Sequence, residues 1–109
     1  MARSAPPDEV FRSLADPTRR GILEHLLAGG EQNVRMLTER AGVSQATVSK
    51  HLGVLKQAGL VRDRPQGRMV HYAADPQGLS PLMDWIGFYS TFWRDRLDRL
   101  DTVLDRIEP

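Results

Sequence analysis

Apolar residues recur along this chain at the three- and four-residue spacings of amphipathic helices, which predicts helices over 8–14 and 34–41. Between these segments, Asp16 and Pro17 form a helix start in which the aspartate caps the helix and the proline occupies its first turn. The helix that follows places apolar side chains on one face: Ile22, Leu23, Leu26 and Leu27. Three helices in succession predict a helical body.

A fourth helix is predicted over 44–58, with Ser44 as its N-cap and Gly59 at the position that ends it. A stripe spaced by four and three residues faces the body: Val48, Leu52 and Leu55. The remaining positions of its first two turns carry small or polar side chains suited to base edges and phosphates: Ser44, Gln45, Ala46, Thr47, Ser49 and Lys50. We expect this face to contact DNA, with Gln45 reading adenine.

The pattern changes after this helix to strand, turn and strand. Strands are predicted over 61–64 and 69–73 around a turn at 65–68 that contains proline and glycine. Three polar side chains surround the tip and can reach a phosphate or the minor groove: Arg64, Gln66 and Arg68. A hairpin directly after a capped polar helix predicts a winged helix-turn-helix fold, mainly helical with a small β-hairpin, whose 44–58 helix enters the major groove.

The longest helix is predicted over 80–107, with Ser80 as its cap and Pro81 in its first turn. At about 1.5 Å per residue it forms a rod of roughly 40 Å, which so small a body cannot cover. Its apolar stripe includes five aromatic residues within nine positions: Trp85, Phe88, Tyr89, Phe92 and Trp93. We interpret this cluster as the core of a dimer interface, where aromatic residues are enriched. The alternative is a small apolar effector pocket between this helix and the body.

Composition limits the classes of protein to consider. With 109 residues the chain is predicted to form one domain over 8–109 after a disordered start at 1–7. The absence of cysteine excludes disulfides, thiolate metal ligands and thiol redox sensing. Charges interrupt every apolar stretch, and the start lacks the apolar segment of a signal peptide, so we expect a cytoplasmic protein with no membrane span.

The net charge of +1 is unevenly distributed along the chain. Residues 44–73 contain five basic side chains and one acidic side chain, whereas residues 80–109 contain four arginines and six acids. A basic middle beside a neutral or acidic remainder is typical of a localised phosphate-binding face, although an ordinary solvated surface has the same appearance. The charge pattern is therefore consistent with the predicted DNA-binding helix and hairpin.

Three stretches together resemble the ArsR/SmtB family of bacterial winged helix-turn-helix repressors: ADPTRRGIL at 15–23, VSQATVSKHLGVLKQAGLV at 43–61 and GRMVHY at 67–72. The resemblance covers nearly the whole chain. It implies the element order α-α-α-α-β-β-α and a homodimer paired through the first and last helices. It also implies repression of a promoter, frequently the protein's own. On this basis the expected dimer-interface residues are Phe11, Leu82, Trp85, Ile86, Tyr89, Trp93, Leu97 and Leu100.

Many members of this family sense metals, but the ligands are missing here. Cysteines are absent, and the 80–107 helix contains no histidine to complete a carboxylate site. The three histidines, His25, His51 and His71, lie on different predicted elements without ligand spacing, and His51 is expected to pack or to contact backbone. We therefore expect no metal and no cofactor, and the sequence resembles the cysteine-free branch of the family.

The predicted function is sequence-specific binding of double-stranded DNA by a homodimer at an inverted-repeat operator, which regulates transcription. The family resemblance implies that this regulation is repression. An enzyme is not expected, because neither a phosphate-binding glycine loop nor a Ser/His/acid spacing occurs. Two alternatives stay open at this point. One is a winged-helix adaptor that binds proteins, and the other is a repressor with a small apolar effector at the aromatic interface.

Overall fold

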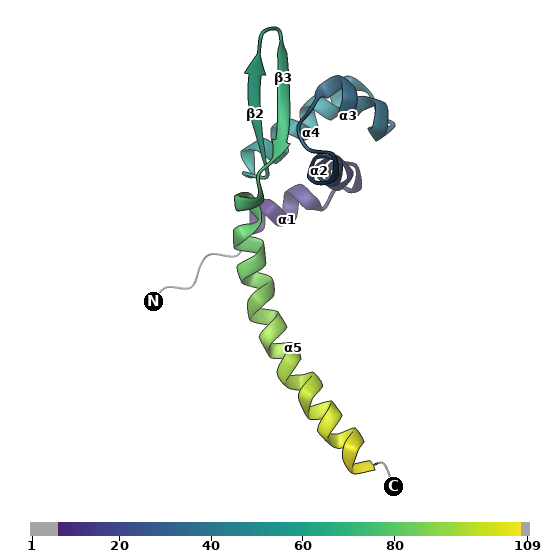
Figure 1. The fold of residues 1–109 in the computed structure, drawn as a ribbon, viewed down its shortest axis with the longest axis vertical. Helices are drawn as coiled ribbons and strands as arrows, with labels where there is room; N and C mark the ends of the chain where they lie inside the picture. The colour runs from purple at the N-terminus through teal and green to yellow at the C-terminus, as the bar shows by residue number, and fades with distance from the viewer. Residues whose placement is uncertain (1–6, 108–109) are drawn as a thin grey trace, which may run out of the picture.

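In the computed structural model, residues 7–107 are described, and they form a helical body, a three-stranded sheet and one long helix (Figure 1). The body contains α1 (Asp8–Leu14), α2 (Pro17–Gly29), α3 (Val34–Ala41) and α4 (Gln45–Gln57). The sheet contains β1 (Gln32–Asn33), β2 (Val61–Gln66) and β3 (Met69–Ala74). A 3-10 turn, η1 (Pro76–Leu79), leads into α5 (Ser80–Ile107). The mainly helical winged helix-turn-helix prediction is confirmed.

Side-chain caps at the starts of α2 and α3 satisfy the first backbone N–H groups of these helices. The carboxylate of Asp16 accepts from the backbone N–H of Arg19 at 2.9 Å, and the amide of Asn33 accepts from that of Met36 at 2.9 Å. The Asp16 cap was predicted, because a capping residue acts within one turn of its own position in the chain. The core that the body helices enclose consists of aliphatic side chains: Val10, Ile22, Leu23, Leu26, Leu37, Val48, Leu52, Leu55, Leu60 and Val61.

The sheet differs from the predicted two-stranded hairpin in two respects. The short strand β1 pairs antiparallel with β3, with Gln32 opposite Tyr72, so the strand order is β1-β3-β2. The turn is also tighter than the expected 65–68, because Gln66 pairs with Met69 and only Gly67 and Arg68 lie between the strands. Gly67 has a φ of 63°, which the first position of a type II′ turn requires.

Pro65 was expected in the turn but lies within β2, opposite Val70. The sheet tolerates a proline here because β2 is an edge strand, with β3 as its neighbour, and a missing N–H group can face solvent.

The long helix α5 has the predicted bounds but a different start. Ser80 has helical backbone angles, φ −56° and ψ −45°, and does not act as the N-cap. The cap and proline pair stands one turn earlier, where the Asp75 carboxylate accepts from the backbone N–H of Gln77 at 3.0 Å and Pro76 begins η1. Figure 1 shows α5 running from the base of the hairpin away from the body. None of its described residues is buried.

The predicted disordered start, 1–7, lies outside the described residues except for Pro7, which is buried and precedes α1. No helix in the part of the chain that the structure describes is long and apolar enough to cross a membrane.

Candidate nucleic-acid interface

The helix α4 presents the polar face that the sequence predicted. Val48, Leu52 and Leu55 are fully buried against the body. Of the six predicted contact residues of this helix, Thr47 is half-buried. The other five are exposed: Ser44, Gln45, Ala46, Ser49 and Lys50. The stripe and the exposed face together fix which side of α4 is available to a ligand, because a helix cannot rotate without exposing its apolar stripe.

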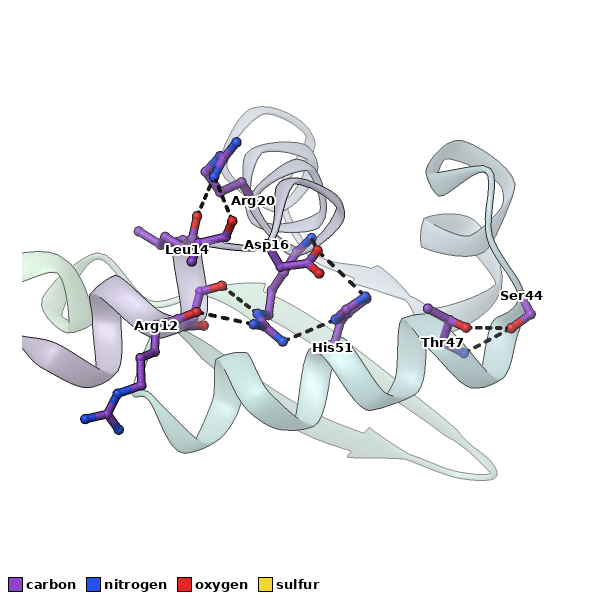
Figure 2. A network of polar contacts seen from close by, with 10 residues as sticks. Arg12, Leu14, Asp16, Arg20, Ser44, Thr47 and His51 are labelled. Atoms are coloured by element: carbon purple, nitrogen blue, oxygen red, sulfur yellow. Dashed lines mark hydrogen bonds and ion pairs between the residues drawn. The ribbon is translucent and has the colours of Figure 1, made fainter.

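The start of α4 is closed by Ser44, as predicted. Its hydroxyl oxygen accepts from the backbone N–H of Thr47 at 3.2 Å and lies 2.8 Å from the Thr47 hydroxyl (Figure 2). The Thr47 hydroxyl is therefore part of the cap. What Thr47 presents to a ligand is mainly its methyl group, which suits an apolar contact such as a thymine methyl.

The end of α4 is fixed by a pair of backbone hydrogen bonds around Gly59. The N–H of Leu60 donates to the Leu55 carbonyl at 2.9 Å, and the N–H of Gly59 donates to the Lys56 carbonyl at 3.0 Å. This is a Schellman motif, with Gly59 at the left-handed position, φ 80°, and with Leu55 and Leu60 both buried. The predicted stop at Gly59 is confirmed.

A hollow of about 300 Å³ lies between the first turns of α3 and α4 and the wing, which we define as strands β2 and β3 with their turn. Gln45 from α4 and Arg68 from the wing both line it, so the structure brings together two predicted contacts that are 23 positions apart in the sequence. The other lining residues are Asn33, Val34, Arg35, Met69, Val70 and Tyr72. The hollow thus combines amide and guanidinium donors from α4 and the wing.

Arg35 also lines this hollow, and the sequence did not single it out. It lies in the first turn of α3, its side chain is highly exposed, and Nε lies 3.8 Å from Oε1 of Glu39. A lone arginine at the start of a short helix carries no signal of its own. Its place in the same hollow as Gln45 becomes visible only when α3 and α4 are packed together.

Arg64, in the middle of β2, is held by an acid beside the wing. Its guanidinium donates to both carboxylate oxygens of Glu31, which lies between α2 and β1. The two bonds to Arg64 lower the pKa of the Glu31 carboxyl below its ordinary value. Arg64 pairs with His71 in the ladder, three positions before the turn, whereas Gln66 and Arg68 lie at the tip. The expectation that all three surround the tip is therefore wrong for Arg64.

Further ion pairs reduce the positive charge that the sequence predicted over 44–73. Lys56 Nζ lies 2.9 Å from Asp63 Oδ2, and this bond raises the pKa of Lys56 and lowers that of Asp63. Arg62 Nε lies 3.5 Å from Oδ2 of Asp75. Within residues 7–107, two basic side chains of this stretch have no ion-pair partner: Lys50 and Arg68. The net charge of residues 44–73 overstated the number of unpaired cations, because two of the acids that pair with them, Glu31 and Asp75, lie outside this stretch.

A second polar network joins α1, α2 and α4 (Figure 2). The guanidinium of Arg19 donates to the carbonyls of Ser13 and Arg12, and that of Arg20 donates to the Leu14 carbonyl at 2.7 Å. These carbonyls belong to the last turn of α1, where the helix supplies no N–H four positions ahead, although the Arg12 carbonyl also accepts from the Ala15 N–H at 3.3 Å. The two arginines thus cap the end of one helix from the start of the next. The sequence had identified the Asp16 cap but no role for these arginines.

His51 connects this network to α4. Its Nδ1 lies 3.4 Å from Nη1 of Arg19, its Nε2 lies 4.0 Å from Oδ1 of Asp16, and its side chain is 13% exposed. The expectation that His51 packs is confirmed, although its polar contacts are to side chains and not to backbone. The hydrogen bond from the Arg19 backbone N–H and the positive charge of the Arg19 side chain lower the pKa of Asp16.

The predicted dimer-interface residues form an apolar stripe along α5 that continues onto α1. Phe11 meets Trp85 edge to face with ring centroids 5.0 Å apart, and Trp85 packs on Tyr89 at 4.6 Å. Further along the stripe, three side chains are each more than half exposed: Trp93, Leu97 and Leu100. Leu82 is half-buried, and Ile86 is exposed. A stripe of this size leaves apolar surface that a single chain cannot bury.

No group of three or more His, Asp or Glu side chains that could hold a metal ion occurs among residues 7–107. The three histidines lie apart on α2, α4 and β3.

Comparisons with known proteins agree with this geometry. The family described as "Helix-turn-helix domain" matches residues 14–64. The chain is 46% identical over 105 residues to the HTH-type transcriptional regulator Rv2034 of Mycobacterium tuberculosis, covering 96% of this chain and 94% of that protein. It is 34% identical over 79 residues to the transcriptional repressor SdpR of Bacillus subtilis, covering 72% and 87%.

Two solved structures have the same architecture. An ArsR-like transcriptional regulator from Rhodococcus sp. RHA1 superposes with a TM-score of 0.71 at 30% identity, covering 90% of this chain and 92% of that chain. A homodimeric winged helix-turn-helix DNA-binding domain from Mycobacterium bovis, a possible ArsR-family regulator, superposes with a TM-score of 0.62 at 27% identity, covering 84% and 91%.

Proposed function

The chain belongs to the ArsR/SmtB family of winged helix-turn-helix transcriptional regulators, and from this premise we propose that it binds double-stranded DNA as a homodimer. The observation that carries the proposal is the shared hollow of Gln45 and Arg68, which places a base-reading amide and a free cation on one surface. In this arrangement α4, which we now call the recognition helix, enters the major groove. The wing tip, Gln66 with Arg68, follows the adjacent backbone.

The role of each residue on this surface follows from the chemistry of its side chain. Gln45 can form two hydrogen bonds with adenine, and Ala46 with the Thr47 methyl suits a thymine methyl. Ser49, Lys50 and Arg68 suit phosphates, which position the protein without reading sequence. Ser44 closes the helix, and Arg64 contributes to DNA binding only when it leaves Glu31.

We propose that the partner in the homodimer is a second copy paired through α5 and α1. The exposed stripe of Phe11 and α5 supports this, and so does the homodimeric Mycobacterium bovis domain of similar fold. A two-fold dimer predicts an inverted-repeat operator with half-sites about one helical turn apart. In this proposal residues 80–107 are the dimerisation helix of the single domain over 8–109, and the protein acts as a regulator and not as an enzyme.

The test of DNA binding is a salt titration on duplex DNA. Two free cations per protomer, Lys50 and Arg68, predict that the logarithm of the affinity falls with the logarithm of the salt concentration at a slope of about −4 for the dimer. A protein-binding adaptor, the rival function, would show no duplex binding or a flat salt dependence.

Repression is the regulatory outcome that the SdpR relative supports, and the family resemblance extends it to the protein's own promoter. Footprinting on the DNA upstream of its own gene, followed by a reporter assay with and without the protein, tests this outcome. The protein would then act in the cytoplasm, where a bacterial chromosome lies.

A small apolar effector at the aromatic cluster stays the second candidate feature, and a ligand that shifts both thermal stability and duplex affinity would support it.

A further inference from the structure

The segment that ends the recognition helix and the 3-10 turn η1, which leads into α5, meet backbone to backbone at Gly78. A Cβ atom on Gly78 would lie very close to the carbonyl oxygen of Gly59 and 3.2 Å from Cα of Leu60. Both atoms belong to backbone, so no side-chain rotation can relieve the overlap. Any residue other than glycine at position 78 must therefore separate η1 from the end of the recognition helix.

The chain on both sides of this contact is held in place. The N–H of Asp75 donates to the Leu60 carbonyl at 2.8 Å, and the Asp75 carboxylate lies 3.5 Å from Arg62 Nε at the start of the wing. On the other side, the Schellman bonds tie Gly59 and Leu60 to the last turn of the recognition helix. We call this region, in which Gly59 and Leu60 contact Asp75 and Gly78, the joint. It consists of direct hydrogen bonds and one close backbone contact.

No flexible segment separates the joint from the long helix. The N–H of Gly78 donates to the Asp75 carbonyl at 3.0 Å, and Ser80, the residue that ends η1, already has the backbone angles of α5. With 28 residues α5 is about 42 Å long, so a tilt of about 10° at its start would move its far end by roughly 7 Å. Figure 1 shows α5 extending away from the body from the base of the wing.

We propose that Gly78 is a positioning residue for DNA recognition, because it sets the angle between the recognition helix and the helix that pairs the protomers. This inference rests on the proposed function. In a dimer joined through α5, that angle determines the distance between the two recognition helices. The distance must match half-sites about 34–36 Å apart, one turn of the DNA helix. Gly78 thereby acts on the preferred half-site spacing through the backbone contact with Gly59 and Leu60.

The experiment compares Gly78→Ala with the wild type and with Gly87→Ala. Gly87 lies on α5, and a Cβ atom added there would meet no atom within 4 Å, so it is the matched control for the same chemical change. The probe is an inverted-repeat duplex selected from a random pool by the wild-type protein. Related probes have half-sites moved apart or together by one base pair at a time, and a last probe carries a single half-site.

For Gly78→Ala we expect an intact dimer by sedimentation and half-site affinity within about twofold of wild type. Affinity for the selected duplex should fall at least about tenfold, and a duplex of different spacing should become the preferred one. Gly87→Ala should keep the wild-type spacing preference. A loss caused by lower stability alone would reduce binding to every duplex by the same factor and would overturn the inference, as would an unchanged spacing preference.

Asp75→Ala serves as a second variant, which decides the question if Gly78→Ala does not fold. It removes the cap of η1 and the contact with Arg62, and so loosens the joint without forcing it apart. We expect it to flatten the dependence of affinity on spacing, and a wild-type profile would overturn the inference. If the wild type selects no duplex, the proposed function fails. If it selects one and both variants retain its spacing preference, only the role of Gly78 fails.

Discussion

Nη1 of Arg19 lies 3.4 Å from Nδ1 of His51, so an arginine at the start of α2 reaches the middle of the recognition helix. A guanidinium can only donate, which makes Nδ1 the acceptor and leaves the hydrogen on Nε2, facing the Asp16 carboxylate. The same guanidinium donates to the last turn of α1. The guanidinium of Arg19, which belongs to α2, therefore links this helix to α1 and to α4.

Replacing Arg19 with lysine should destabilise the protein although the charge is kept. A single ammonium cannot span the Ser13 carbonyl and His51 in the way a planar guanidinium does. Since hydrogen bonds to charged groups contribute about 1.5–3 kcal/mol each, we expect a loss of about 2 kcal/mol in the free energy of unfolding, measured by urea denaturation. Arg12→Lys is the control, because Arg12 takes part in this network through its carbonyl. Equal stability of the two variants would contradict this role.

Gln45 and Arg68 line one hollow, but their substitution should have different effects on DNA binding. Gln45→Ala should remove about 1–3 kcal/mol of discrimination at one base pair of each half-site and leave the salt slope unchanged. Arg68→Ala should weaken all duplexes by a similar factor and reduce the salt slope by about 2 for a dimer. Competition binding with mutated duplexes over a salt series measures both. A change of base preference in Arg68→Ala would contradict the division between base and phosphate contacts.

The helices were predictable because their signals are local. Ser44, Asn33 and Asp16 each act on an N–H group three positions away, so their caps can be recognised without knowing the fold. The features that the sequence did not indicate depend on distant pairs. Arg64 meets Glu31 across 33 positions, and Gly78 meets Gly59 only when η1 has docked. Such contacts leave no periodic trace in the sequence, and a count of charges over a window cannot detect them.

The pairing of Glu31 with Arg64 should make part of the stability depend on pH. The pKa of Glu31 is lowered in the folded chain, so its contribution is complete above the unfolded value of 4.5 and is lost as pH falls through the lower folded value. We expect wild type to have a higher melting temperature than Glu31→Gln at neutral pH, and the difference to disappear in acid. Melting curves of both proteins, recorded from neutral pH to well below the unfolded pKa, measure this. A difference that persists at the acid end would contradict the assignment.

Glu31→Gln should also change DNA binding, because it releases the Arg64 guanidinium in the middle of β2. A freed cation can contact phosphate, so we expect tighter binding to any duplex and a steeper salt slope. Glu24→Gln is the control, since it removes the same charge from an exposed residue of α2 that lines neither the hollow nor the wing. Weaker or unchanged binding by Glu31→Gln would mean that Arg64 does not reach the DNA.

Leu97→Glu should separate the proposed dimer, and Trp93→Glu should do the same. Both side chains are more than half exposed in the single chain, so a charge there costs little in the monomer. In a dimer the same charge would be buried without a partner, which is strongly unfavourable. Thr102→Glu is the control, because Thr102 lies between Leu100 and Leu104 in sequence but on the opposite side of α5. Sedimentation should give monomers for the first two variants and dimers for the third. A dimer in all three would place the interface elsewhere, and a monomer that keeps full operator affinity would remove the need for pairing.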